Sequence, residues 1–286
     1  MSLYRIILVA LTLQYDCFCE LIPDKRHVAD GFDEPMLVNK GLPPESYDWR
    51  KSNKVTPVKD QGACNICSVF SAVANIESQL VIHTGKQEIL SEAFIMDCTA
   101  NINCGQYTSI LDVFSVIVTN YGGVLKDTDY FTYEARKSSC RWERSKHVLN
   151  NTLEMNSKDF YYLRRSHATP VSVIGFRRVK SNEDVMAEYI YKFGPLSAAI
   201  NSKSMDTYTH GIDEPTIENC SPNELDHAVL IVGYSEYVSP DTGKITPYWI
   251  IKNSWGTGWG DSGYYYLVRG RNACGIAMDV SFAFVN

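Results

Sequence analysis

The cysteines constrain this chain more than any other feature. Among its 286 residues are nine cysteines, and Cys64 and Cys67 stand close together in the stretch QGACNICSVFS (61–71). From Cys67 to about residue 83 the apolar residues recur at near-helical spacing, and Gly85 can end that helix. Two cysteines at the start of a helix can be a redox pair, two metal ligands, or a structural cysteine beside a reactive thiol.

The N-terminus predicts a secretory route. Arg5 precedes the apolar run 6–13 (IILVALTL), which the small residues Cys17 and Cys19 follow. This run is too short to cross a bilayer, and the order of its parts is typical of a signal peptide rather than of a buried strand. We therefore predict a signal peptide over 1–19 and a secretory protein, either extracellular or lysosomal.

Removal of that peptide leaves seven cysteines. An odd number in an oxidising compartment leaves one thiol free if the others pair. A glycosylation sequon at Asn150 (N-N-T) fits the same route. The net charge of −6, without a basic block, argues against nucleic-acid binding.

The rest of the chain predicts an α+β fold with two lobes, because helical patterns come early and strands late. Residues 20–42 are polar and aperiodic, and we expect a short pro-segment or linker there. Further helices are predicted over 108–120 and 182–192. The predicted strands are 196–200, 227–234, 248–252 and 263–268.

The surroundings of Cys67 favour nucleophilic chemistry. A thiol in the first turn of a helix is pushed toward thiolate by the positive helix end. A redox pair would need a βαβ unit upstream, which the sequence does not indicate. A zinc site would need a second compact ligand pair, so we expect neither a metal ion nor another cofactor.

Three separated motifs resemble the papain family of cysteine proteases, in its cathepsin L-like branch. They are QGACNICSVFS (61–71), LDHAV (225–229) and YWIIKNSWG (248–256), in the family's order of Cys, His and Asn. The resemblance covers residues 43–286. It implies a papain-like domain with a helical lobe over about 54–150 and an antiparallel, β-barrel-like lobe over about 151–286, with the site in the cleft between them.

The resemblance also implies a role for each site residue. Cys67 would be the nucleophile and His227 the general acid and base. Asn253 would hold the imidazole while Trp255 shields that hydrogen bond, and Gln61 would donate to the oxyanion. The implied disulfides, which leave Cys67 free, are Cys64–Cys104, Cys98–Cys140 and Cys220–Cys274.

The chain departs from the family beside the nucleophile. Asn65 and Ile66 replace Gly and Ser, and Ser68 replaces Trp. The family's Gly-Gly that binds substrate main chain corresponds to Gln106 and Tyr107, so Tyr107 either stacks on a substrate side chain or fills the cleft.

Further substrate contacts are implied on the histidine side. Leu225 and Asp226 precede His227, and Asp279 falls where the family has the floor of its S2 pocket. A buried carboxylate favours a cationic partner, so we expect Asp279 to accept Arg or Lys at P2.

The sequence thus predicts a monomeric cysteine endopeptidase that acts on peptides or proteins and is open to protein inhibitors of thiol proteases. The alternative is a papain-like protein with impaired catalysis that binds peptides or inhibitors in its cleft.

Overall fold

The computed structural model describes residues 28–29, 41–143 and 168–286. The predicted signal peptide, most of the predicted pro-segment and Asn150 lie outside the described residues. These three predictions therefore stay predictions.

Four α-helices form in the described residues, and three of them were predicted. They are α1 (Cys67–Thr84), α2 (Glu92–Cys98), α3 (Ile110–Val116) and α5 (Glu183–Phe193). Gly85 ends α1 at φ +72°, a conformation that glycine adopts without strain. Asn182 caps α5 by accepting bonds from two backbone N–H groups. Sequence reasoning missed α2, whose cap is Ser91.

The strands lie mainly in the second half of the chain. They are β1 (Val28–Ala29), β2 (Tyr47–Asp48), β3 (Gly123–Val124), β4 (Val171–Arg178), β5 (Leu196–Ile200), β6 (Ile212–Asp213), β7 (His227–Val238), β8 (Ile245–Lys252), β9 (Tyr264–Val268) and β10 (Val280–Val285). All four predicted strands form, whereas β4 and β10 were not predicted.

These strands confirm the α+β fold, but they correct the prediction of a β-barrel-like lobe. The main path of the sheet runs β1-β4-β10-β5-β7-β8-β9-β6. Its neighbours are antiparallel except at the two ends, where β1 pairs with β4 and β6 with β9 in parallel. Among the described residues the end strands do not pair with each other, so the sheet is open rather than a closed barrel.

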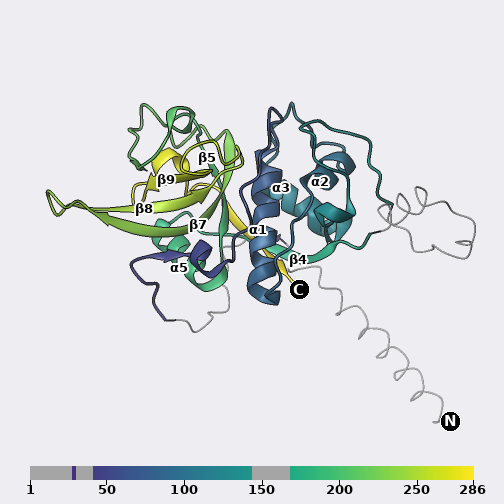
Figure 1. Cartoon of the computed structure of the whole chain (residues 1–286), viewed down its shortest axis with the longest axis horizontal. Helices are drawn as coiled ribbons and strands as arrows, with labels where there is room; N and C mark the ends of the chain where they lie inside the picture. Colours follow the sequence, from purple (N-terminus) through teal and green to yellow (C-terminus); the bar gives the residue numbers. More distant parts are fainter. Residues whose placement is uncertain (1–27, 30–40, 144–167) are drawn as a thin grey trace, which may run out of the picture.

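Helix α1 occupies the middle of the molecule. In Figure 1 it stands between the sheet that carries β5, β7, β8 and β9 and the helices α2 and α3. Nearly all of its side chains are buried, because it contacts β7 and β10 on one face and α2 and α3 on others. A helix apolar on most sides is the kind that a core surrounds.

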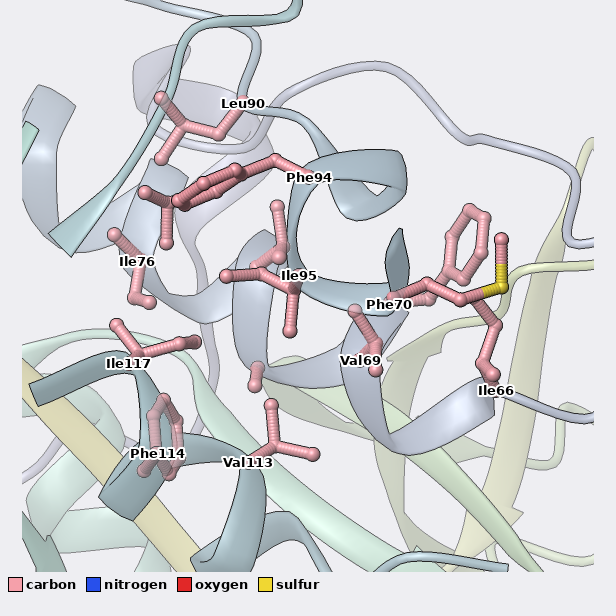
Figure 2. Packing of buried hydrophobic residues seen from close by; sticks show 14 of the residues in the cluster. Ile66, Val69, Phe70, Ile76, Leu90, Phe94, Ile95, Val113, Phe114 and Ile117 are labelled. Atoms are coloured by element: carbon pink, nitrogen blue, oxygen red, sulfur yellow. The ribbon is translucent and has the colours of Figure 1, made fainter. Parts of the chain in front are cut away.

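Each lobe has its own apolar core. Figure 2 shows the core of the helical lobe, where Val69 of α1, Phe94 of α2 and Phe114 of α3 pack together. Val173 of β4 and Val285 of β10 join this same core. Strands from the second half of the chain thus complete the helical lobe and fix it against the sheet.

Candidate active site

Cys67 is the first residue of α1 and the free cysteine of the described residues. Its side chain is buried, and this burial raises the pKa of the thiol to about 11. Hydrogen bonds from backbone N–H groups, first that of Ala228, oppose the rise. Ala228 directly follows His227, so the thiol faces the start of β7.

His227 is the first residue of β7, and Asn253 follows the last residue of β8. Their side chains meet with 2.8 Å between His227 Nε2 and Asn253 Oδ1. The backbone N–H of Ser254 also donates to Oδ1, at 2.8 Å, which identifies that atom as the acceptor. Nε2 therefore carries the proton, and Nδ1 is left as the basic nitrogen of the ring.

Trp255 covers this pair. Its ring lies 4.9 Å from the His227 ring, centroid to centroid, at an angle of 33°, and it contacts Trp259 on another side. Burial lowers the pKa of His227, and the bond to Asn253 opposes that effect. The site therefore favours a neutral imidazole with a fixed tautomer.

Gln61 lies between the two lobes, close to the nucleophile. Its Nε2 donates to the Cys64 carbonyl at 3.1 Å, and its Oε1 accepts from Ser254 Oγ at 2.7 Å. Its backbone N–H donates to the Ser254 carbonyl at 2.8 Å. A side-chain amide has two N–H donors, so Nε2 keeps one for another acceptor.

Three disulfides join cysteines of the described residues, and they are the pairs that the resemblance implied. They are Cys64–Cys104, Cys98–Cys140 and Cys220–Cys274. The first of these holds the loop around residue 104 against the nucleophile segment, where the Asn65 N–H donates to the Cys104 carbonyl at 3.3 Å.

The three residues beside the nucleophile that depart from the family pattern differ in their exposure. Ile66 and Ser68 are buried, and Ile66 belongs to the core of the helical lobe. Asn65 is exposed, and its Oδ1 lies 4.0 Å from Cys67 Sγ. Of these three residues, Asn65 alone is exposed.

Gln106 and Tyr107 stand on the loop that the first disulfide holds. The side chain of Gln106 is bonded to Asn103 at 3.1 Å. Tyr107 is 44% exposed, and its pKa is raised to about 12, first by burial and then by the charges of Cys67, Asp279 and Asp226. Charges act over several ångströms, so these effects place Tyr107 in the neighbourhood of the nucleophile without defining a contact.

Asp279 lies in the same region but is not free. Its Oδ1 is 3.8 Å from an Arg178 nitrogen on β4, and its pKa is raised, first by burial and against the effect of Arg178. Asp112 adds to the rise. Asp226 accepts a bond from the Ser202 N–H at 2.7 Å, and Leu225 packs against the core of the helical lobe.

Sequence reasoning assigned no role to two residues of this site. Ser254 joins Gln61 to Asn253 through its hydroxyl and its backbone N–H, a role that its place in the motif YWIIKNSWG does not indicate. Arg178 supplies the cation beside Asp279, which lies far from it in sequence, so no local pattern indicates the pair.

The described residues contain no group of three or more His, Cys, Asp or Glu side chains that could hold a metal ion. No helix within the described ranges is long and apolar enough to span a membrane.

Comparison with known proteins identifies the family. The sequence model of the papain family cysteine proteases matches residues 43–284. Cysteine proteinase 15A of Pisum sativum is 37% identical over 256 residues, which cover 86% of this chain and 63% of the pea protein. This chain thus spans less than two thirds of that relative's length.

Solved structures agree with the sequence match. Digestive procathepsin L 3 of Tenebrio molitor larval midgut is similar with a TM-score of 0.69 and 30% identity, over 91% of this chain and 76% of that one. The bromelain protease of Ananas comosus in complex with the E64 inhibitor is similar with a TM-score of 0.67 and 29% identity, over 85% of this chain and 100% of that one. The chain therefore belongs to the papain family of cysteine proteases.

Proposed function

We propose that this protein is a cysteine endopeptidase that hydrolyses peptide bonds through a thioester on Cys67. The observation that carries the proposal is the pairing of His227 Nε2 with Asn253 Oδ1, because it leaves Nδ1 as the ring's proton acceptor. The backbone bond from Ala228 to the thiol supports the same arrangement, since it brings Cys67 to the histidine strand.

In the first half of the reaction, His227 Nδ1 takes the thiol proton as Cys67 Sγ attacks the peptide carbonyl carbon. The carbonyl oxygen becomes an oxyanion, which accepts from the free N–H of Gln61 Nε2 and from the Cys67 backbone N–H. The imidazolium then gives its proton to the leaving amine, and the thioester remains.

In the second half, His227 takes a proton from water, which attacks the thioester carbonyl. The C–S bond breaks, the thiolate regains the proton through the imidazole, and the acid product leaves. Asn253 Oδ1 accepts from Nε2–H in both halves, so the ring keeps one orientation while its charge changes.

Burial changes the pKa of both Cys67 and His227. It raises the pKa of Cys67 and lowers that of His227, so each group taken alone favours its neutral form. Proton transfer makes two opposite charges that attract each other in a site with little water, and the positive end of α1 favours the thiolate. We therefore expect proton transfer and attack on the carbonyl to be closely coupled.

The proposal extends to substrate preference and setting. We propose peptides with Arg or Lys at P2, which would compete with Arg178 for Asp279. A secretory location, extracellular or lysosomal, is supported by the apolar run at 6–13 and by three disulfides, which persist in oxidising compartments. We further propose that the protein acts as a monomer and is a target of protein inhibitors of thiol proteases.

The test is labelling with the epoxysuccinyl inhibitor E-64, with iodoacetamide as a small alkylating agent in parallel. We expect one label per molecule at Cys67, located by peptide mass mapping, and loss of E-64 labelling in His227→Ala. The matched control is His83→Ala, because His83 is exposed in the last turn of α1.

The two reagents separate the alternatives. Alkylation by iodoacetamide without E-64 labelling or peptide turnover would favour a protein that binds peptides or inhibitors without cleaving them. The specific observation behind this alternative is Tyr107, which stands where the family has a glycine and whose pKa is raised, after burial, by the charge of Cys67.

A further inference from the structure

A group of buried charges lies between the lobes, outside the residues that the reaction uses. Lys59 Nζ is 2.7 Å from Glu77 Oε1 and 2.7 Å from Glu92 Oε1, and it donates to the Leu90 carbonyl at 2.9 Å. The Leu90 N–H also donates to Glu77 Oε1, at 2.8 Å. The two carboxylates are buried on α1 and α2, so they need these partners.

A second buried cation joins this group through a hydroxyl. Lys252 Nζ donates to Thr56 Oγ1 at 3.0 Å, and Thr56 Oγ1 in turn donates to Glu77 Oε2. Lys252 is 4% exposed, and burial lowers its pKa to about 8 while the charge of Glu77 opposes the change. We name this chain of contacts, Lys252–Thr56–Glu77, the interlobe bridge.

The interlobe bridge ends on the two elements that hold the reacting groups. Glu77 lies on α1, the helix that begins with Cys67, and the two residues are about 15 Å apart along its axis. Lys252 is the last residue of β8, and the next residue is Asn253, which holds His227.

A small cavity lies beside the Lys252 end of the bridge. It has about 20 Å³ of space, enough for about one water molecule, and is lined by residues that include Lys59, Lys252 and Asn253. Without the Thr56 hydroxyl, the buried Lys252 Nζ would lose that acceptor. A buried polar group without its partner is costly, so we expect the end of β8 to shift toward a new one.

We propose that Thr56 and Lys252 are positioning residues, which set the distance between Cys67 and the His227–Asn253 pair by joining β8 to α1. This role rests on the proposed function, because it concerns the geometry of that reaction. Displacement of a reacting group by about 1 Å can slow a reaction about 100-fold, so a small shift of Asn253 is enough to matter.

The test compares Thr56→Val with Thr56→Ser. Valine has the shape of threonine without the hydroxyl, whereas serine keeps the hydroxyl without the methyl group. In Thr56→Val we expect kcat to fall about tenfold or more while KM stays within about twofold, and Thr56→Ser to recover most of the loss. The rate of Cys67 alkylation by iodoacetamide at pH 6, where only an activated thiol reacts, should fall by a similar factor.

Two controls separate positioning from stability. Lys126→Met removes an ion pair with Glu88 that lies at the surface, and its rates should match those of wild type. Thermal unfolding of each variant gives the folded fraction, by which every rate is corrected. A merely structural role would lower kcat only in proportion to that fraction.

The outcomes are distinct. If Thr56→Val and Thr56→Ser have equal corrected rates of turnover and alkylation, the positioning role is wrong and the proposed function stands. If wild type itself shows no turnover, the proposed function fails, and the alkylation rates alone decide: a loss in Thr56→Val that serine restores supports the bridge, and equal rates overturn it.

Discussion

The two sides of the candidate active site follow the papain family pattern to different degrees. On the histidine side, His227, Asn253 and Trp255 occupy motif positions and are held by one another through a hydrogen bond and a ring contact. On the nucleophile side, Cys67 keeps its place at the helix start, but Asn65 and Tyr107 stand where the family has glycines.

This difference distinguishes the residues proposed to transfer protons from the residues proposed to contact the substrate. Proton transfer needs fixed atoms at hydrogen-bond distance, and the histidine side is buried and bonded accordingly. Asn65 and Tyr107 are exposed, and Asn65 Oδ1 lies 4.0 Å from Cys67 Sγ. We therefore expect changes on the histidine side to slow catalysis with every substrate and changes at Tyr107 or Asp279 to alter substrate preference.

The largest expected effect is that of Cys67→Ser. A hydroxyl is a much weaker nucleophile than a thiolate, so kcat/KM should fall about 1,000-fold or more. The measurement is hydrolysis of a fluorogenic dipeptide substrate by protein whose fold is checked by circular dichroism. Residual activity near the wild-type level would show that another group is the nucleophile.

Asn253→Ala should be the next most severe change. It removes the acceptor of His227 Nε2–H and of the Ser254 N–H, which frees the ring to turn and leaves two buried donors unpaired. We expect kcat to fall about 10- to 100-fold, and the free energy of unfolding to drop by about 1–3 kcal/mol.

The matched control is Asn223→Ala, since Asn223 is exposed and lies outside the site. Steady-state kinetics and urea unfolding of both variants measure the two effects. If Asn253→Ala kept full kcat with only reduced stability, Asn253 would be structural and the histidine side would need another orienting group.

The proposed catalytic residues could be picked out from the sequence because each one lies within a local motif. The start of α5 and the end of α1 could be predicted for the same reason, because Asn182 and Gly85 each cap a helix that adjoins them in sequence. Helix α2 was missed because it is short and its first five residues are all buried, which leaves no amphipathic period to recognise.

Contacts between distant segments could not be predicted. Arg178 and Asp279 meet because β4 pairs with β10, and neither of these strands was predicted. The interlobe bridge likewise joins Thr56, Glu77 and Lys252, whose approach depends on the packing of α1 against the sheet. Partners of this kind are set by tertiary structure, and periodicity carries no information about them.

Tyr107→Gly tests the other side of the comparison. Removal of the ring should open the cleft and restore the backbone pattern of the family, so kcat/KM for substrates with a bulky P2 residue should rise about 10-fold. The rate of Cys67 alkylation by iodoacetamide should stay within about twofold, because that reagent is small and does not need P2 space. A fall in turnover with every substrate would instead mean that Tyr107 binds the peptide.

Asp279→Ala should have the smallest effect and acts on specificity alone. We expect the ratio of kcat/KM for Z-Arg-Arg over Z-Phe-Arg reporter substrates to fall about 3- to 10-fold, because a carboxylate is lost that can pair with a P2 cation. Arg178 already lies 3.8 Å from this carboxylate, which limits the gain that a substrate cation can obtain. An unchanged ratio would mean that Arg178 fully occupies Asp279.

The pH dependence of that ratio sharpens the test. Burial raises the pKa of Asp279 above its ordinary value, although Arg178 opposes the rise. A raised pKa means that the carboxyl gains its proton earlier as pH falls, so the preference for arginine at P2 should weaken on the acid side before ordinary carboxyls titrate. In Asp279→Ala the ratio should be flat over the same range, whereas a slope common to both proteins would assign the titration to another group. The histidine side should show no such substrate dependence, since His227 and Asn253 act on the peptide bond itself and not on the P2 side chain.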